Sequence, residues 1–146
     1  MKRFENRVAI VTGAGGGIGS AIARRLAAEG ALVVVTDVNV EAAAAVVQGI
    51  EAEGGRATAI AADIAKKDAC LSLIEQAFAL EGRIDVLVNN AGINRRGNLL
   101  SLSDEDWEIS FTVNLDSMFH LCRAVLPHMI AAGGGAIVNT ASQWGL

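Results

Sequence analysis

A run of glycines directly after a short apolar segment is the first feature of the chain with a chemical use. The stretch is VAIVTGAGGGIG, from Val8 to Gly19. Between a strand and a helix, loop glycines let backbone N–H groups approach a pyrophosphate at the positive end of the helix. The stretch therefore predicts a phosphate-binding loop, with a sterically tight turn as the alternative. It is not the common G-x-G-x-x-G pattern, because Gly13 and Gly15 would place the third glycine at Ile18. It is not a P-loop either, since no Lys-Ser or Lys-Thr pair follows.

A carboxylate beyond these glycines favours a dinucleotide as the ligand. Asp37 ends the second apolar run, close to the roughly 20-residue spacing at which an acid reaches an adenosine ribose. There it would accept hydrogen bonds from both ribose hydroxyls and repel a 2′-phosphate, and the glycine loop holds no Arg or Lys to attract one. Both features favour NAD(H) over NADP(H). Two alternatives remain: an aspartate that only ends a strand, and an S-adenosylmethionine methyltransferase, which shares the loop and the acid.

Alternating apolar runs and helical patterns are the elements that must position these groups. Strands are predicted over residues 8–12, 32–36, 57–61, 84–88 and 136–140, and helices over 18–29, 40–53, 66–81 and 103–132. In the first helix, Ile18, Ile22 and Leu26 recur every four residues and predict its apolar face. In the last helix the predicted face is Met118, Cys122, Val125, Leu126 and Met129. The alternation predicts an α/β protein with a Rossmann-like, doubly wound parallel sheet. We expect one domain over residues 1–146, cut short after about the fifth strand.

Composition narrows the class of protein further. The chain has 146 residues, 52% hydrophobic but only 4% aromatic, as suits a parallel sheet buried on both faces. A net charge of -4 argues against nucleic-acid binding. No apolar run is long enough to span a bilayer, and the start lacks a signal-peptide core. Cys70 and Cys122 share no metal-ligand spacing, so we expect no metal site and a reduced, cytoplasmic protein.

The glycine loop also fits a particular family motif. Thr12, Gly13, Gly17, Ile18 and Gly19 match T-G-x-x-x-G-I-G, the cofactor motif of the short-chain dehydrogenase/reductase family, which the chain resembles over essentially its whole length. The resemblance implies NAD as the cofactor and the following cofactor-binding residues: Gly13, Gly15, Gly16, Gly17, Ile18, Gly19, Asp37, Asp63, Ile64, Asn90, Ala91 and Gly92.

Two of these groups have separate expected roles. By resemblance, Asn90 of the N-N-A-G motif braces the sheet, and the backbone of Ala91 and Gly92 passes close to the cofactor. Asp63 and Ile64 match the family's adenine contact, a carboxylate for the exocyclic amine and a backbone N–H beside it. Asp63 could equally cap the next helix.

The resemblance also implies catalytic residues and a reaction. Asn114 aligns with the family's catalytic Asn, which holds a water in a proton relay; a buried amide within a helix needs partners. Ser142 aligns with the catalytic Ser, whose hydroxyl would bind the substrate oxygen and stabilise its developing charge. The implied activity is NAD(H)-dependent interconversion of a secondary alcohol and a ketone.

The chain departs from the family in one respect. The family's general acid is the Tyr of a Y-x-x-x-K motif about a dozen residues beyond the catalytic Ser, whereas this chain has no tyrosine and ends at Leu146. We therefore expect the amino-terminal half of such an enzyme, which at full length would form a homodimer or tetramer. A non-catalytic dinucleotide-binding fragment or pseudoenzyme is the alternative.

The expected partner is a small-molecule alcohol or ketone, with neither nucleic acid nor a membrane. Arg95 or Arg96 could bind an anionic group on that substrate or could simply be solvated. Gln143 and Trp144 flank Ser142 and could line its pocket.

Overall fold

The structure is a computed structural model that describes residues 2–142. It contains one five-stranded sheet in the order β3-β2-β1-β4-β5, with every neighbouring pair parallel. The strands are β1 (Val8–Thr12), β2 (Leu32–Thr36), β3 (Arg56–Ala59), β4 (Val86–Asn89) and β5 (Ala136–Asn139). The predicted α/β fold with a Rossmann-like parallel sheet is therefore confirmed, and the first two strands have the predicted bounds.

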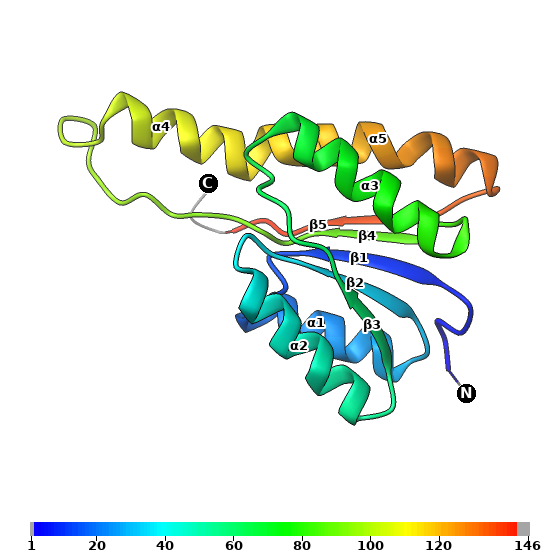
Figure 1. The fold of residues 1–146 in the computed structure, drawn as a ribbon. Coiled ribbons are helices and arrows are strands. Elements are labelled where there is room, and N and C mark those ends of the chain that lie inside the picture. Colours follow the sequence, from blue (N-terminus) through cyan, green and yellow to red (C-terminus); the bar gives the residue numbers. More distant parts are fainter. Residues whose placement is uncertain (1, 143–146) are drawn as a thin grey trace.

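Helices cover both faces of the sheet. They are α1 (Gly17–Ala28), α2 (Val40–Ala52), α3 (Lys67–Glu81), α4 (Asp104–Phe111), the π-helical turn η1 (Thr112–Asp116) and α5 (Ser117–Ala131). Figure 1 shows α1 and α2 below the sheet and α3, α4 and α5 above it. Parallel strands need such crossovers, and the crossovers bury both faces of the sheet. None of the described helices is long and apolar enough to cross a membrane.

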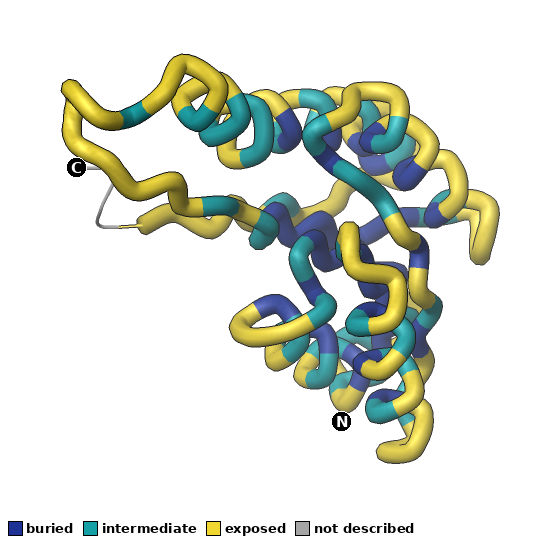
Figure 2. The backbone as a smooth tube through the Cα atoms, turned by 60° about the vertical axis from the view of Figure 1, so that its left-hand side comes forward, coloured by how far each residue is buried: buried dark blue, intermediate teal, exposed yellow. Residues whose placement is uncertain are grey.

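The core divides into two layers because β-strand side chains alternate between the faces. Val8 and Ile10 pack with α3 and α5, whereas Ala9 and Val11 pack with α1 and α2. Figure 2 shows the buried segments in the middle of the fold, while the loop before α4 is exposed. The three central strands β1, β2 and β4 are buried along nearly their whole length and contain almost only apolar residues, whereas the edge strands β3 and β5 are partly exposed.

The predicted apolar face of α1 is wrong, and that of α5 is right only for Val125 and Met129. In α1 the buried residues are Gly19, Ala23 and Ala27, and Ile18 is 70% exposed. Small residues against the sheet let this helix approach the strands closely. In α5 the buried face consists of Ser117, Leu121, Val125 and Met129. Apolar residues occupy most sides of that helix, so their spacing alone does not select the buried side.

Candidate functional site

The loop after β4 is tied to the loop after β1 by a hydrogen-bonded brace. The Thr12 hydroxyl accepts from the backbone N–H groups of Asn90 and Ala91, at 3.1 Å each. The Asn90 side-chain amide donates to the carbonyls of Thr12 at 3.1 Å and Gly13 at 3.4 Å. These strands are neighbours in the sheet, so the brace joins two loops at the edge where parallel sheets bind ligands.

Two glycines of the loop are required by close backbone contacts. Gly13 has φ +62°, and a Cβ there would lie 2.7 Å from the Cα of Ala91. A Cβ on Gly19 would lie 2.2 Å from the carbonyl oxygen of Gly13 and would strike the amide of Asn90. The glycine loop, the first turn of α1 and the loop after β4 therefore pack backbone against backbone. By contrast, a Cβ on Gly16 would meet nothing within 4 Å.

The amino-terminal end of α1 lies at this packed junction. The helix begins at Gly17, and no side chain caps it. Its first N–H groups and its dipole therefore remain available to an anion, as at the phosphate sites of other glycine-loop helices. Since Gly13 and Gly16 also line the adjacent cleft, a phosphate in the cleft would lie close to this helix end.

The Asp37 carboxylate faces the glycine loop from the end of β2. One oxygen accepts from the Gly15 N–H at 2.9 Å, and the other accepts from the Asn39 N–H at 3.0 Å. A Cβ on Gly15 would lie 2.8 Å from the carboxylate, so this contact also depends on glycine. Asp37 thus contributes a fixed negative charge where the second strand meets the cleft.

The turn after β3 forms another wall. Asp63 accepts at Oδ1 from the Ala65 N–H, 3.2 Å away, and its carbonyl accepts from the Lys66 N–H at 3.0 Å. Lys66 also forms an ion pair with the Asp63 carboxylate at 3.3 Å. Ile64 is buried, 8% exposed. The predicted cap for the next helix is absent: α3 begins after Lys66, and no side chain caps it.

These groups enclose one cleft of about 550 Å³. Its lining comes from the loops after β1, β2, β3 and β4 and from one side of α4 and η1. Of the predicted cofactor residues, the cleft brings together Gly13, Gly16, Asp37, Asp63, Ile64, Asn90, Ala91 and Gly92. Three features were not predicted from the sequence: Thr12 as the centre of the brace, Thr36, and the apolar wall formed by Ile109 and Val113.

The two predicted catalytic residues share a second, smaller hollow of about 440 Å³. Asn114, in η1, is exposed rather than buried, which corrects the expectation, but it has the expected partners. Its Oδ1 accepts from the Ile93 N–H at 2.8 Å, and its Nδ2 donates to the Ile93 carbonyl at 2.9 Å. Ser142 lines the same hollow beyond β5. Gln143 and Trp144 lie outside the described residues.

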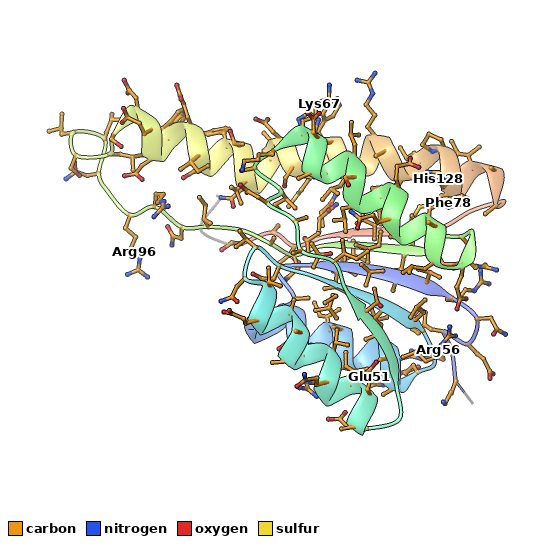
Figure 3. All side chains as sticks on the ribbon, in the orientation of Figure 1. Glu51, Arg56, Lys67, Phe78, Arg96 and His128 are labelled. Atoms are coloured by element: carbon orange, nitrogen blue, oxygen red, sulfur yellow. The ribbon has the colours of Figure 1, made fainter. Side chains whose placement is uncertain are left out.

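The two arginines after the N-N-A-G loop differ in their surroundings. Arg95 lines the larger cleft and pairs with Asp106 at the start of α4, with 3.5 Å between the charged atoms. Arg96 extends away from the fold into solvent (Figure 3). Among residues 2–142, no group of His, Cys, Asp or Glu could hold a metal ion.

A buried carboxylate at the opposite edge of the sheet was not predicted. Asp85 is 7% exposed and accepts from Arg7 at 2.7 Å, from Arg83 at 2.6 and 2.8 Å, and from the Val8 N–H at 2.9 Å. Burial by itself would raise the pKa of Asp85, but hydrogen bonds from Arg83, Val8 and Arg7 outweigh it and lower the pKa to about 2. The group ties β1 to β4 and lies away from the cleft.

The fold and the cleft together define a class: an α/β domain with a nucleotide-sized cleft at the carboxyl ends of its parallel strands. Comparison with known proteins makes this more specific. A family model described as short chain dehydrogenase matches residues 7–146. The chain therefore belongs to the short-chain dehydrogenase/reductase family, which leaves the methyltransferase alternative without support.

Individual relatives agree with this assignment. Cyclohexanol dehydrogenase of an Acinetobacter species is 45% identical over 99% of this chain and 58% of the relative. A metagenomic short-chain oxidoreductase in complex with NADP has a TM-score of 0.92 and 44% identity, over 95% of this chain and 63% of that one. A 7α-hydroxysteroid dehydrogenase complexed with NADH and a 7-oxo bile acid has a TM-score of 0.89 and 40% identity, over 92% and 52%. The chain thus spans between about half and two thirds of each of these proteins.

Proposed function

We propose that this chain is the cofactor-binding part of an NAD(H)-dependent oxidoreductase that interconverts a secondary alcohol and a ketone. Residues 1–146 would form one NAD-binding domain, with the cofactor lying along the larger cleft. The pyrophosphate would meet the uncapped start of α1, and the adenosine would extend towards Asp37 and Asp63. Family membership and the cyclohexanol dehydrogenase relative support the reaction class.

The position of Asp37 is the main observation that favours NAD(H) over NADP(H). Its carboxylate is bonded to the Gly15 N–H at the end of β2, so a 2′-phosphate there would meet a fixed negative charge. The segment from Thr12 to Gly19 holds no Lys or Arg that would offset this charge. The solved relatives include complexes with NADP and with NADH, so family membership alone leaves the choice of cofactor open.

The smaller hollow supports the chemical part of the proposal. A bound nicotinamide would supply or accept the hydride. The Ser142 hydroxyl would hydrogen-bond the substrate oxygen, and so stabilise the negative charge that develops on it. Asn114, locked to the Ile93 backbone by two hydrogen bonds, would keep η1 and the loop after β4 at a constant separation beside the reacting group. A water held near Asn114 would relay the proton that the substrate hydroxyl releases or takes up.

The proposal extends to assembly of the full-length enzyme into a homodimer or tetramer. Large apolar side chains are exposed along α4, η1 and α5, including Trp107, Phe111, Leu115, Phe119 and Ile130. Contiguous exposed apolar surface of this kind favours association. Sedimentation velocity would show a mass above that of the monomer; a monomer at all concentrations tested would contradict this part of the proposal.

The choice of NAD(H) is tested by reversing the charge at the end of the cleft that would hold the adenosine. In the double variant Asp37→Ala/Gly16→Arg, the carboxylate is removed and a cation is added at a position with open space and extended backbone, φ -174°. We expect the affinity ratio of NADH to NADPH, measured by fluorescence titration, to fall by at least about tenfold, because a desolvated charge contact is worth more than 1 kcal/mol. Glu51→Ala, which removes an exposed carboxylate from α2, is the control. An unchanged ratio would contradict the assignment of Asp37.

A second candidate function is dinucleotide binding without turnover. It concerns the 146 residues by themselves: they contain no tyrosine, and alcohol oxidation needs a group that exchanges the hydroxyl proton. For this chain by itself we expect NADH binding but no NADH oxidation with cyclohexanone. Measurable turnover would show that another group supplies the proton.

A further inference from the structure

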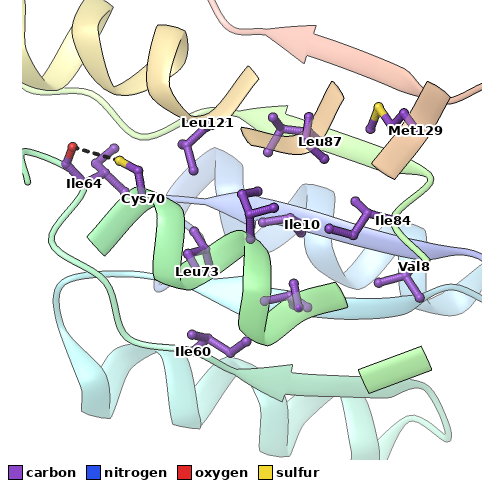
Figure 4. Close-up of a cluster of buried hydrophobic side chains, with 14 residues drawn as sticks. Val8, Ile10, Ile60, Ile64, Cys70, Leu73, Ile84, Leu87, Leu121 and Met129 are labelled. Atoms are coloured by element: carbon purple, nitrogen blue, oxygen red, sulfur yellow. Dashed lines mark hydrogen bonds between the residues drawn. The ribbon is translucent and has the colours of Figure 1, made fainter. Parts of the chain in front are cut away.

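Cys70 is a fully buried thiol that touches the wall of the larger cleft from behind. It lies in the first turns of α3, where its side chain is 0% exposed. Its sulfur lies 3.3 Å from the carbonyl oxygen of Ile64, and the thiol donates this hydrogen bond. Figure 4 shows the contact at the end of the cluster formed by Leu73, Leu121 and their neighbours.

The contact adds to the hydrogen bonds that hold the short turn before α3, where the Ala62 N–H donates to the Asp37 carbonyl and the Cys70 N–H donates to the Lys66 carbonyl. Around Asp63, the N–H groups of Ala65 and Lys66 bond back to the side chain and the carbonyl. On the side of α3, the Cys70 thiol is the one hydrogen bond to the Ile64 backbone among residues 2–142. The Ile64 N–H makes no bond to protein within that range, and Ile64 lines the cleft. An unbonded N–H at the surface of a cleft is a donor for a ligand.

The thiol keeps its proton under ordinary conditions. Burial and, to a smaller extent, the nearby Asp63 carboxylate together raise the pKa of Cys70 to about 11. Cys70 therefore remains a neutral donor at neutral pH, and its burial keeps it from solvent oxidants. A serine would preserve the donor, whereas a valine of similar size would remove it.

We propose that Cys70 is a positioning residue for the adenine end of the cleft. Through the carbonyl of Ile64, the thiol holds the Ile64 N–H and the Asp63 carboxylate at the orientation in which they meet the base. This inference rests on the proposed dinucleotide function, because it assumes that adenine occupies the Asp63 end. It makes a thiol on α3 part of cofactor recognition, although that thiol touches no ligand.

Separate binding probes for the two halves of the cofactor can distinguish this positioning role from a general packing role. AMP and nicotinamide mononucleotide are titrated into the chain and into its variants, with binding followed by NMR. We expect Cys70→Val to weaken AMP binding about fivefold, as loss of one hydrogen bond predicts, and to leave nicotinamide mononucleotide unaffected. Cys70→Ser should restore AMP binding. Ala77→Gly, further along α3, is the control that loosens the helix without touching the thiol.

The titrations can contradict the positioning role of Cys70 in three ways. If Cys70→Val binds AMP as the native chain does, or if it weakens both probes equally, the positioning role is contradicted. The same holds if Ala77→Gly reproduces the selective loss. If Cys70→Val fails to fold, as judged from its thermal melt, Cys70→Ala takes its place with the same expectation. If the native chain binds neither probe, the proposed function itself fails, and this inference fails with it.

Discussion

At the residue scale, the cleft depends on a small number of polar atoms that each serve two segments. Thr12 bonds two N–H groups of the loop after β4, and Asp37 bonds the glycine loop. Thr12 is 1% exposed, and its partners Asn90 and Ala91 are partly buried. Removing such an atom leaves buried donors unsatisfied, which costs more than the hydrogen bond contributed.

The variant Thr12→Val tests this dependence. It keeps the shape of the side chain but leaves the N–H groups of Asn90 and Ala91 without their acceptor. We expect the free energy of unfolding to fall by about 2 kcal/mol, with a parallel loss of NADH affinity, both measured with urea and fluorescence. Thr12→Ser, which keeps the hydroxyl, should lose far less. Equal losses in the two variants would show that the methyl group, rather than the brace, is what matters.

At the element scale, the start of α1 must pack directly on the glycine loop. Gly19 lies in the first turn, facing the Gly13 carbonyl and the Asn90 amide. Gly16, immediately before the helix, faces open space. The two positions therefore differ sharply in their tolerance of a methyl group, although both are glycines of one motif.

Gly19→Ala should separate helix and loop, because its Cβ would lie 2.2 Å from the carbonyl oxygen of Gly13. We expect NADH affinity to fall at least about tenfold, since the displaced helix end no longer meets the phosphates. Gly16→Ala is the matched comparison: its Cβ would meet no protein atom within 4 Å, so it should lose far less NADH affinity than Gly19→Ala. Similar losses in both variants would mean that loop flexibility, rather than close packing, underlies binding.

The same element shows how far the sequence could predict the structure. Strand positions and the glycine loop were predictable because they depend on contiguous residues, and Asp37 because it ends a strand. The buried side of α1 was not, since Ile18 and Ala23 are both apolar and only contact with the sheet distinguishes them. Likewise Asn114 meets Ile93 through a tertiary contact, and Cys70 meets Ile64 through the path of the turn before α3; the apolar spacing predicts neither contact.

At the scale of the whole molecule, the two ends of the parallel strands have different roles. The carboxyl edge holds the cleft, while at the other edge Asp85 ties β1 to β4 with the help of Arg7 and Arg83. A further contact joins the helices above the sheet, where His128 stacks on Phe78 with ring centres 4.1 Å apart (Figure 3). These contacts stabilise the frame that places the loops.

The Asp85 cluster predicts a definite dependence of stability on pH. The folded pKa of about 2 lies below the ordinary value of 3.8, so the stabilisation is complete above pH 4 and is lost as pH falls towards 2. The difference corresponds to about 2 kcal/mol. In Asp85→Asn this component should be absent, so the gap in unfolding free energy between native chain and variant should narrow between pH 4 and 2. A constant gap, measured by urea unfolding, would contradict the assignment.

The central claim is that the cleft binds a dinucleotide and that Asp37 excludes a 2′-phosphate. The most direct measurement is calorimetric titration of the native chain with ADP-ribose and with 2′-phospho-ADP-ribose, which differ only in that group. We expect ADP-ribose to bind at least about tenfold more tightly, because the 2′-phosphate would meet the Asp37 carboxylate without a compensating cation. Equal or tighter binding of 2′-phospho-ADP-ribose, or no binding of either, would contradict it.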